Sequence, residues 1–286
     1  LSKLIRPHVA IITNVGEAHI ENFNSLNGIA AAKGEIISNI EKNGLLILNR
    51  DNKYFNYFSK RAKTKKLTVI SFGMNKNSEI YPLKIKKDKI FTKISVKINK
   101  QVLNFKFKNI NIYNVLSSLA LLKGLKLNLS KVTKFYSKYE ATEGRGKIHR
   151  INRYKKNFKL IDESYNANPL SVKNAIINLN SIKKQKFKKY LILGDMLELG
   201  TKSEKLHKNL SRVINNSDID KVFVKGLETL ATYKNISKKK RGNILQQDED
   251  IDFTLNQIIA NNDYLMIKGS NATGLNNITN RIIRGY

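Results

Sequence analysis

Short apolar runs alternate with amphipathic stretches and polar loops along the first half of the chain. Runs rich in β-branched residues predict strands at residues 8–12, 45–48, 67–72, 90–98 and 102–107. The last two flank Asn99-Lys100, which is typical of a hairpin. Apolar positions at helical spacing predict helices at residues 26–41, 112–123 and 130–139. We expect Ser25 to cap the first helix and Gly124 to follow the end of the second.

The second half alternates strand and helix patterns more regularly. Strands are predicted at residues 158–161, 190–193, 222–224, 244–245 and 264–267. Helices are predicted at residues 171–182, 203–215, 227–233, 251–261 and 275–283. Such alternation indicates a parallel, doubly wound sheet. A glycine-rich break at residues 143–146 places the domain boundary, so we expect an α/β protein with domains 1–143 and 144–286.

The net charge of +31 changes the range of possible partners. It is compatible with a polyanion ligand, with general attraction of an anionic nucleotide, or with compositional drift toward lysine, asparagine and isoleucine in an AT-rich genome. The cations are scattered along nearly every element, without a nucleic-acid-binding module or an aromatic ladder. We therefore favour drift and expect no specific nucleic-acid partner.

Cysteine usage and apolar run length limit the chain further. The absence of cysteine excludes disulfides and thiolate zinc sites. No apolar run is long enough to span a membrane, and no signal peptide is visible, so we expect a cytoplasmic monomer without membrane insertion. Leu1 is not an initiating methionine and enters an element almost at once, which indicates an N-terminally truncated fragment.

One lysine stands in an apolar helical series. The predicted helix at 26–41 has its series at Ile29, Ile36, Ile37 and Ile40. Lys33 falls four residues after the first of these, on the same predicted face. It either snorkels from the edge of that face or sits where desolvation lowers its pKa. A neutral amine can form a carbamate with carbon dioxide, and His19 in the preceding loop could then share a Mg²⁺ ion with it.

Polar motifs directly follow two predicted strands of the second half. Residues 161–169 read I-D-E-S-Y-N-A-N-P, and residues 193–200 read L-G-D-M-L-E-L-G. Open α/β sheets bind ligands at the carboxyl ends of their strands, where Asp162 could accept hydrogen bonds from a ribose. Arg145 lies between two glycines that let the backbone approach a ligand, so it is either a phosphate-binding group or a solvated hinge arginine.

These motifs resemble the ATP-dependent Mur ligases of peptidoglycan synthesis. The resemblance extends to P-H-V-A-I-I-T-N-V-G-E-A-H at residues 7–19 and A-A-K-G-E-I at residues 31–36, and it covers nearly the whole chain. Within the family, the Y-N-A-N-P segment is similar to that of the members that add D-alanyl-D-alanine to UDP-N-acetylmuramoyl-tripeptide. The resemblance implies a partial P-loop-type central domain followed by a Rossmann-like C-terminal domain.

The resemblance also implies roles for individual residues around ATP and Mg²⁺. Lys33 matches the carbamylated lysine, and His19 helps to place the second magnesium ion. The other implied nucleotide contacts are Asn14, Asn114, Arg145, Asp162, Tyr165 and Asn166. Asn114 belongs to a G-x-H-N-x-x-N-A pattern in which Lys108 and Ile110 replace the glycine and the histidine, so a plain helix N-cap is the alternative for it.

A second group is implied for the dipeptide pocket, in which K-G-S at residues 268–270 resembles a family segment. Its members are Asn168, Asp195, Lys268, Gly269 and Ser270, with His207 at the family's helix histidine. Part of the Asn168 motif is equally explained as a helix start at Pro169.

The implied reaction is ATP-dependent amide formation through an acyl phosphate. The family's G-x-x-G-K-[ST] phosphate loop is absent from the 286 residues and would precede Leu1, so we expect this fragment alone to be inactive. The implied substrates are UDP-N-acetylmuramoyl-tripeptide and D-alanyl-D-alanine. The alternatives are a sister ligase that adds another amino acid and a basic nucleic-acid-binding protein.

Overall fold

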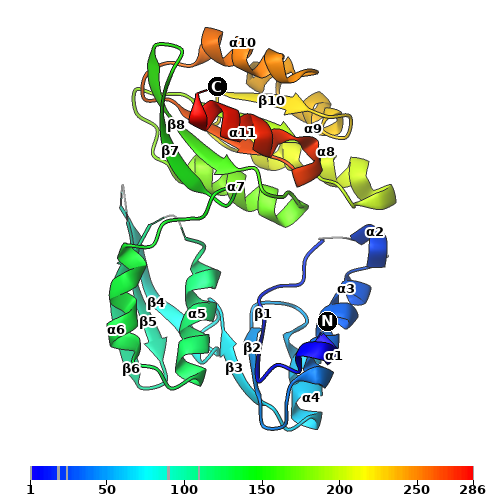
Figure 1. Ribbon diagram of the computed structural model, residues 1–286, viewed down its shortest axis with the longest axis vertical. Coiled ribbons are helices and arrows are strands. Elements are labelled where there is room, and N and C mark those ends of the chain that lie inside the picture. The colour runs from blue at the N-terminus through cyan, green and yellow to red at the C-terminus, as the bar shows by residue number, and fades with distance from the viewer. Residues whose placement is uncertain (1, 18–19, 24, 89–90, 109, 286) are drawn as a thin grey trace. The chain divides into compact units, whose positions relative to one another are not determined.

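The computed structural model describes residues 2–17, 20–23, 25–88, 91–108 and 110–285, and the chain divides into two compact units (Figure 1). The first comprises Leu1–Gly16 and Phe23–Glu140, and the second comprises Glu17–Asn22 and Ala141–Tyr286. The chain passes from the first unit to the second between Glu140 and Ala141, and the predicted domain boundary at residues 143–144 stays a prediction. Each unit is described by itself.

The first unit is built on one mixed six-stranded sheet. Its strands are β1 (Val9–Ile12), β2 (Leu45–Asn49), β3 (Thr68–Phe72), β4 (Ile80–Lys87), β5 (Thr92–Ile98) and β6 (Gln101–Phe107), in that spatial order. β1 to β4 pair in parallel, whereas β4, β5 and β6 pair antiparallel. Its helices are α1 (Ser2–Ile5), α3 (Leu26–Asn39), α4 (Phe55–Thr64), α5 (Ile112–Gly124), α6 (Leu129–Thr133) and the 3₁₀ helix η1 (Lys134–Ser137). The short α2 spans Ile20–Phe23, of which residues 20–22 are grouped with the second unit and Phe23 with the first.

Helices cover both faces of the parallel part of this sheet, with α3 and α4 on one face and α5 on the other (Figure 1). All five residues of β2 are buried, as expected for a central parallel strand covered on both faces. Leu45 and Ile47 of β2 join Leu116 and Leu119 of α5 in one apolar core.

Gly124 is the last residue of α5 and not the residue beyond its end, which corrects the expectation from sequence. A Cβ at Gly124 would lie 2.2 Å from the Leu45 side chain. Glycine is therefore needed here for the close approach of α5 to β2 and not for a left-handed helix end. That conformation belongs to Lys126, with φ 56°.

The second unit contains the six-stranded sheet β11-β10-β9-β12-β8-β7. Its strands are β7 (Lys147–Arg153), β8 (Lys156–Glu163), β9 (Lys189–Gly194), β10 (Lys221–Lys225), β11 (Arg241–Ile244) and β12 (Tyr264–Lys268). Only β7 runs antiparallel to its neighbour. Its helices are α7 (Pro169–Ser181), α8 (Ser203–Asn215), α9 (Leu230–Asn235), α10 (Asp248–Ile258) and α11 (Leu275–Arg284), with 3₁₀ turns η2 (Gly200–Lys202), η3 (Lys238–Lys240) and η4 (Asn271–Thr273).

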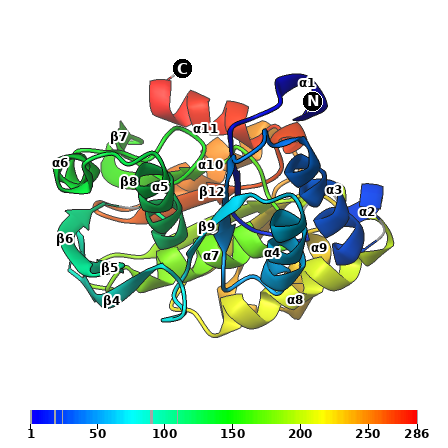
Figure 2. The same cartoon turned by 90° about the horizontal axis from the view of Figure 1, so that it is seen from below.

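The sheet of the second unit is sandwiched between two helical layers. α7 and α8 lie on one side, and α10 and α11 lie on the other (Figure 2). Leu160, Ile192 and Ile267 of the strands pack with Leu255 and Ile278 from the second layer. The predicted doubly wound α/β architecture is confirmed.

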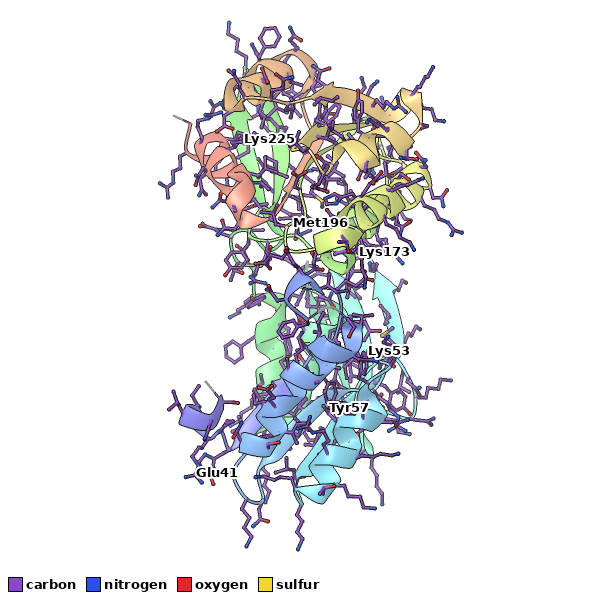
Figure 3. The ribbon with its side chains drawn as sticks, turned by 90° about the vertical axis from the view of Figure 1, so that its right-hand side faces the viewer. Glu41, Lys53, Tyr57, Lys173, Met196 and Lys225 are labelled. Atoms are coloured by element: carbon purple, nitrogen blue, oxygen red, sulfur yellow. The ribbon has the colours of Figure 1, made fainter. Side chains whose placement is uncertain are left out.

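The excess lysines are dispersed over both units. Lys53 and Lys173 are exposed, whereas Lys225 is half-buried and lies 3.3 Å from Asp248 (Figure 3). Within the described ranges, no helix combines the length and apolar character needed to cross a membrane.

Candidate functional site

The loops that leave β1 and β2 are tied to each other at the carboxyl ends of these strands. Asn49 Nδ2 donates to Thr13 O at 3.0 Å. Asn52 Nδ2 donates to the side-chain oxygen of Asn14, and it also lies 3.3 Å from Val15 O. Asn14, predicted as a nucleotide contact, is therefore held by the Asn52 side chain from the loop after β2.

Lys33 lies on α3, whose start is fixed by Ser25, because the Ser25 hydroxyl accepts a hydrogen bond from Gly28 N–H. The buried face of α3 consists of Ile29, Ala30, Gly34 and Ile37. Lys33 is at the margin of this face and is exposed overall, as expected for the alternative in which it snorkels from the edge of the apolar face.

The Lys33 amine nevertheless turns toward the β1 loop, where Nζ donates to Asn14 O at 2.8 Å. Partial burial lowers the pKa of Lys33, which raises the share of the neutral amine that can react with carbon dioxide. The structure thus brings together Lys33 and Asn14. His19 lies outside the described residues, and its predicted role is not tested.

The first turn of α5 carries the third predicted group of this unit. Asn111 is the N-cap, since its side chain accepts a hydrogen bond from Tyr113 N–H at 2.8 Å. Asn114 is exposed at the third helical position, so the N-cap alternative for it is wrong. Its predicted contact with a nucleotide stays a prediction.

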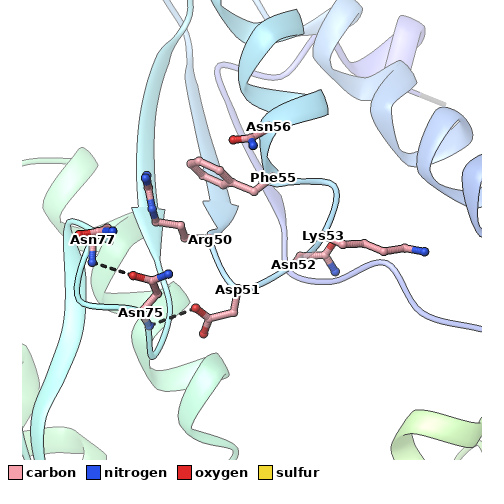
Figure 4. Close-up of a pocket in the computed structure, with 8 residues that line it drawn as sticks. All are labelled: Arg50, Asp51, Asn52, Lys53, Phe55, Asn56, Asn75 and Asn77. Atoms are coloured by element: carbon pink, nitrogen blue, oxygen red, sulfur yellow. Dashed lines mark hydrogen bonds between the residues drawn. The ribbon is translucent and has the colours of Figure 1, made fainter.

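An open polar pocket of about 320 Å³ lies in the first unit, at the loops that follow β2 and β3 (Figure 4). Its lining comes from the loop after β2, the start of α4 and the loop after β3: Arg50, Asp51, Asn52, Lys53, Phe55, Asn56, Asn75 and Asn77. None of these residues belongs to a motif that predicted a function from sequence. The available signal was that polar residues directly follow a buried strand, as at Asp162 and Asp195.

In the second unit, the turn around Arg145 is fastened to the end of β8. Gly144 N–H donates to Asp162 Oδ2 at 2.6 Å, and Gly146 N–H donates to Asp162 O at 2.7 Å. The Arg145 guanidinium lies over the Tyr165 ring, 4.2 Å from its centroid. Both side chains are exposed, so together they present a cation on an aromatic surface.

The two glycines of this turn are needed for its backbone conformation. Gly144 and Gly146 adopt φ values of 71° and 95°, which non-glycine residues rarely adopt. A Cβ on Gly144 would lie 2.6 Å from Tyr165 Cβ. Gly144 therefore lets the turn pack closely on Tyr165, and the predicted approach of this turn to a ligand stays a prediction.

We predict that Gly144→Ala destabilises the chain by about 2–3 kcal/mol, because it adds steric overlap to the cost of the left-handed conformation. Gly274→Ala is the matched control, because Gly274 has φ 75° and no atom within 4 Å of an added Cβ. It should cost only about 1 kcal/mol. Urea unfolding measures both values, and equal losses would contradict the predicted contact with Tyr165.

Asp162 is buried, with an exposed fraction of 2%. Its Oδ1 accepts hydrogen bonds from Ser164 N–H at 3.1 Å and from Ser164 Oγ at 2.6 Å, while Oδ2 binds Gly144. The carboxylate predicted to bind ribose is thus used within the protein. It shapes the turn that carries Arg145.

Lys268, at the end of β12, holds the loop after β8 in place. Lys268 has an exposed fraction of 2%, and its Nζ donates to Asn166 O at 2.9 Å and lies 3.3 Å from Glu163 Oε2. Burial lowers the pKa of Lys268, and the nearby Glu163 carboxylate opposes this shift. Asn168 is the N-cap of α7 in a reciprocal capping box with Ser171, which favours the architectural explanation of this residue.

The remaining predicted dipeptide-pocket residues also face inward. Asp195 Oδ1 accepts a hydrogen bond from Thr229 N–H at 2.8 Å. The Ser270 hydroxyl accepts one from Leu197 N–H at 2.9 Å, and its oxygen lies 3.3 Å from Ala167 O. Gly269 permits close packing, because a Cβ there would lie 2.8 Å from Leu275. These groups join the loops after β8, β9, β10 and β12.

His207 is likewise a buried side chain that holds a loop in place. It is fully buried, and its Nε2 accepts a hydrogen bond from Met196 N–H at 3.0 Å. Because Nε2 is the acceptor, Nδ1 carries the proton and donates to Ser203 O at 2.9 Å. A neutral His207 therefore anchors the loop after β9 to α8.

Metal-binding clusters of the usual kind are not found in the described ranges, where no three His, Cys, Asp or Glu side chains gather. The Asn14 oxygens and a carbamate on Lys33 are hard oxygen donors, which suit Mg²⁺. The donor chemistry beside α3 therefore fits magnesium once Lys33 is modified.

The chain matches two protein-family models. Residues 1–122 match the Mur ligase middle domain, and residues 149–271 match the Mur ligase, glutamate ligase domain. The UDP-N-acetylmuramoyl-tripeptide–D-alanyl-D-alanine ligase of Buchnera aphidicola subsp. Baizongia pistaciae is 29% identical over 100% of this chain and 61% of the relative. The Escherichia coli K12 enzyme of the same name is 31% identical over 80% of this chain and 50% of the relative.

Solved structures have the same fold. MurF from Acinetobacter baumannii superposes with a TM-score of 0.85 at 23% identity, over 99% of this chain and 61% of that one. MurF from Thermotoga maritima in complex with ADP gives 0.82 at 21% identity, over 97% and 62%. The chain thus spans about three fifths of these proteins. The two domain matches and the shared fold show that the chain belongs to the Mur ligase family.

Proposed function

We propose that this chain forms the middle and C-terminal parts of a cytoplasmic ligase that joins D-alanyl-D-alanine to UDP-N-acetylmuramoyl-tripeptide at the expense of ATP. The observation that carries the proposal is the Lys33 amine, which has a lowered pKa and is held against Asn14 O at 2.8 Å. The matching relatives bear the name of this activity.

In the proposed reaction, the tripeptide carboxylate attacks the γ-phosphorus of ATP, and ADP leaves with the bond between the β- and γ-phosphates broken. The amine of D-alanyl-D-alanine then attacks the acyl phosphate, loses a proton and displaces inorganic phosphate. No protein nucleophile is needed, so catalysis consists of positioning and of charge neutralisation. Arg145 supplies a fixed positive charge for phosphate oxygens.

Three groups of residues divide this work. Lys33 as a carbamate, Asn14 and His19 would hold magnesium, which when bound neutralises charge on the transferred phosphoryl group. Asn114 and Tyr165 are exposed and suited to contact the nucleotide. Asn166 lies in the loop that Lys268 supports. Asp162, Asp195, Lys268, Gly269 and Ser270 would shape the second unit's loops from inside.

The test uses the complete reading frame that contains this chain. We expect ADP and phosphate release to require UDP-N-acetylmuramoyl-tripeptide and D-alanyl-D-alanine together. Mass spectrometry should then identify the pentapeptide product. Turnover with a single amino acid or glutamate in place of the dipeptide would favour a sister ligase. Absent turnover together with steeply salt-dependent, structure-selective DNA binding would favour the nucleic-acid alternative.

A further inference from the structure

The loop after β2 contacts both predicted parts of the site in the first unit. Asp51 and Asn52 are adjacent in the chain, just beyond the end of β2. Asn52 reaches the loop after β1, which holds the Lys33 amine. Asp51 reaches the first turn of α5, which carries Asn114.

We call Asp51 and Asn52, with the contacts they make on either side, a brace of two arms. Asn52 forms the first arm. Its amide donates to the side-chain oxygen of Asn14 and lies 3.3 Å from Val15 O. The main-chain oxygen of the same Asn14 accepts the hydrogen bond from Lys33 Nζ. Asn52 therefore fixes the residue on which the Lys33 amine rests.

The second arm is formed by Asp51. Its Oδ2 accepts a hydrogen bond from the Tyr113 hydroxyl at 3.1 Å. Its Oδ1 accepts one from Asn75 N–H at 3.0 Å (Figure 4). Burial and the Asp51 charge raise the pKa of Tyr113 to about 12, so the phenol keeps its proton and donates. Tyr113 immediately precedes Asn114 in α5.

We propose that Asp51 and Asn52 are positioning residues that set the placement of Asn114 and of the Asn14–Lys33 pair. The inference rests on the proposed function, since it assigns those groups to nucleotide and magnesium. Asp51 and Asn52 are neighbours in the chain. One short loop therefore sets the distance between Asn114 and the Asn14–Lys33 pair.

Stability alone does not account for this arrangement. Asp51 is exposed, so water can replace its hydrogen-bond partners, which limits their net contribution to the free energy of unfolding. Yet Asp51 binds residues 23, 24 and 62 positions away in the chain. Its loss should therefore appear in kinetics more than in stability.

Tyr113→Phe in the complete enzyme tests the second arm, because it removes one hydroxyl and keeps the ring. We expect the KM for ATP to rise about 3- to 10-fold, with kcat within about twofold of the unmodified enzyme. Tyr136→Phe is the matched control. Its hydroxyl contacts Ser118 Oγ at 2.6 Å, further along the same helix, and both constants should stay unchanged.

Asn52→Ala tests the first arm and should show the opposite pattern. We expect kcat to fall about tenfold while the KM for ATP stays within about twofold, because Asn14 loses its partner beside Lys33. Asn56→Ala is the control from the same pocket, since no hydrogen bond of the Asn56 side chain occurs among the described residues.

Opposite kinetic patterns with thermal midpoints close to that of the unmodified enzyme would support the inference. It would be overturned if Tyr113→Phe matched Tyr136→Phe, if Asn52→Ala matched Asn56→Ala, or if kinetic losses only followed losses of stability. Failure of the proposed function is recognised separately, because the unmodified enzyme would then lack ATP-dependent dipeptide ligation.

Discussion

Lys33→Ala in the complete enzyme should lose at least about 10²- to 10³-fold in kcat, since the variant cannot form the carbamate that would hold magnesium. The physical basis is the position of the Lys33 amine, which lies in a partly desolvated place beside Asn14 O. Steady-state release of phosphate at saturating substrates measures the loss.

Chemical rescue distinguishes two causes of inactivity in Lys33→Ala, namely loss of the carbamate anion and loss of the native structure. A short carboxylate such as formate or acetate can enter the space left by the lysine side chain, and we expect it to restore part of the activity of Lys33→Ala. Lys33→Arg keeps a positive charge but cannot form the carbamate, so it should remain inactive without rescue. Lys63→Ala, an exposed lysine on neighbouring α4, should behave like the unmodified enzyme.

Full activity in Lys33→Ala would remove the carbamate from the mechanism. Inactivity without rescue, together with a lowered thermal midpoint, would instead assign Lys33 a structural role at the margin of α3. The two outcomes are distinct because Lys33 makes its hydrogen bond to a main-chain oxygen, which remains in place when the lysine is replaced.

Elements with a strong apolar period were predictable from sequence. The predicted helix at residues 203–215 coincides with α8, whose His207, Leu210 and Ile214 are buried on one face. The predicted hairpin across Asn99 is also confirmed, as β5 and β6. In both cases, burial of one face imposes the period that the sequence displays.

Strands with little burial escaped prediction. Only Ile80 is buried in β4, which also contains Pro82 and a break in its pairing register. Only Ile151 is buried in β7. Such strands are held mainly by backbone pairing to their neighbours, and this leaves no regular apolar alternation in the sequence.

The candidate site was also predictable only in part. The polar strand-end motifs located the loops correctly, but not the direction in which each side chain points. Asp162 binds Gly144, and Lys268 binds Asn166, which is 102 residues away in the chain. Contacts of this kind depend on strand order, which places β12 between β8 and β9, and local sequence does not contain that order.

Lys268→Met should destabilise the chain by about 2–4 kcal/mol, because it leaves the Glu163 carboxylate and the Asn166 carbonyl without their buried partner. Loss of this support should also displace the loop that carries Tyr165, so we expect a raised KM for ATP. Urea unfolding and steady-state kinetics of the complete enzyme measure the two effects.

A second buried lysine provides the matched control. Lys189 is fully buried, and its Nζ lies 2.7 Å from Asp218 Oδ1 and 3.1 Å from Asn180 O. Its bonds are made at the beginning of β9, away from the carboxyl ends of the strands. Lys189→Met should therefore lower stability by a similar amount and leave the KM for ATP unchanged.

The pair of variants decides between support and direct substrate contact. If Lys268 touched the dipeptide, Lys268→Met would raise the KM for D-alanyl-D-alanine and leave the free energy of unfolding nearly intact. If it supports the loop, the double variant Lys268→Met with Glu163→Gln should recover part of the lost stability, because the unpaired carboxylate is then neutral. The 2% exposure of Lys268 and its bond to a main-chain carbonyl favour the second result.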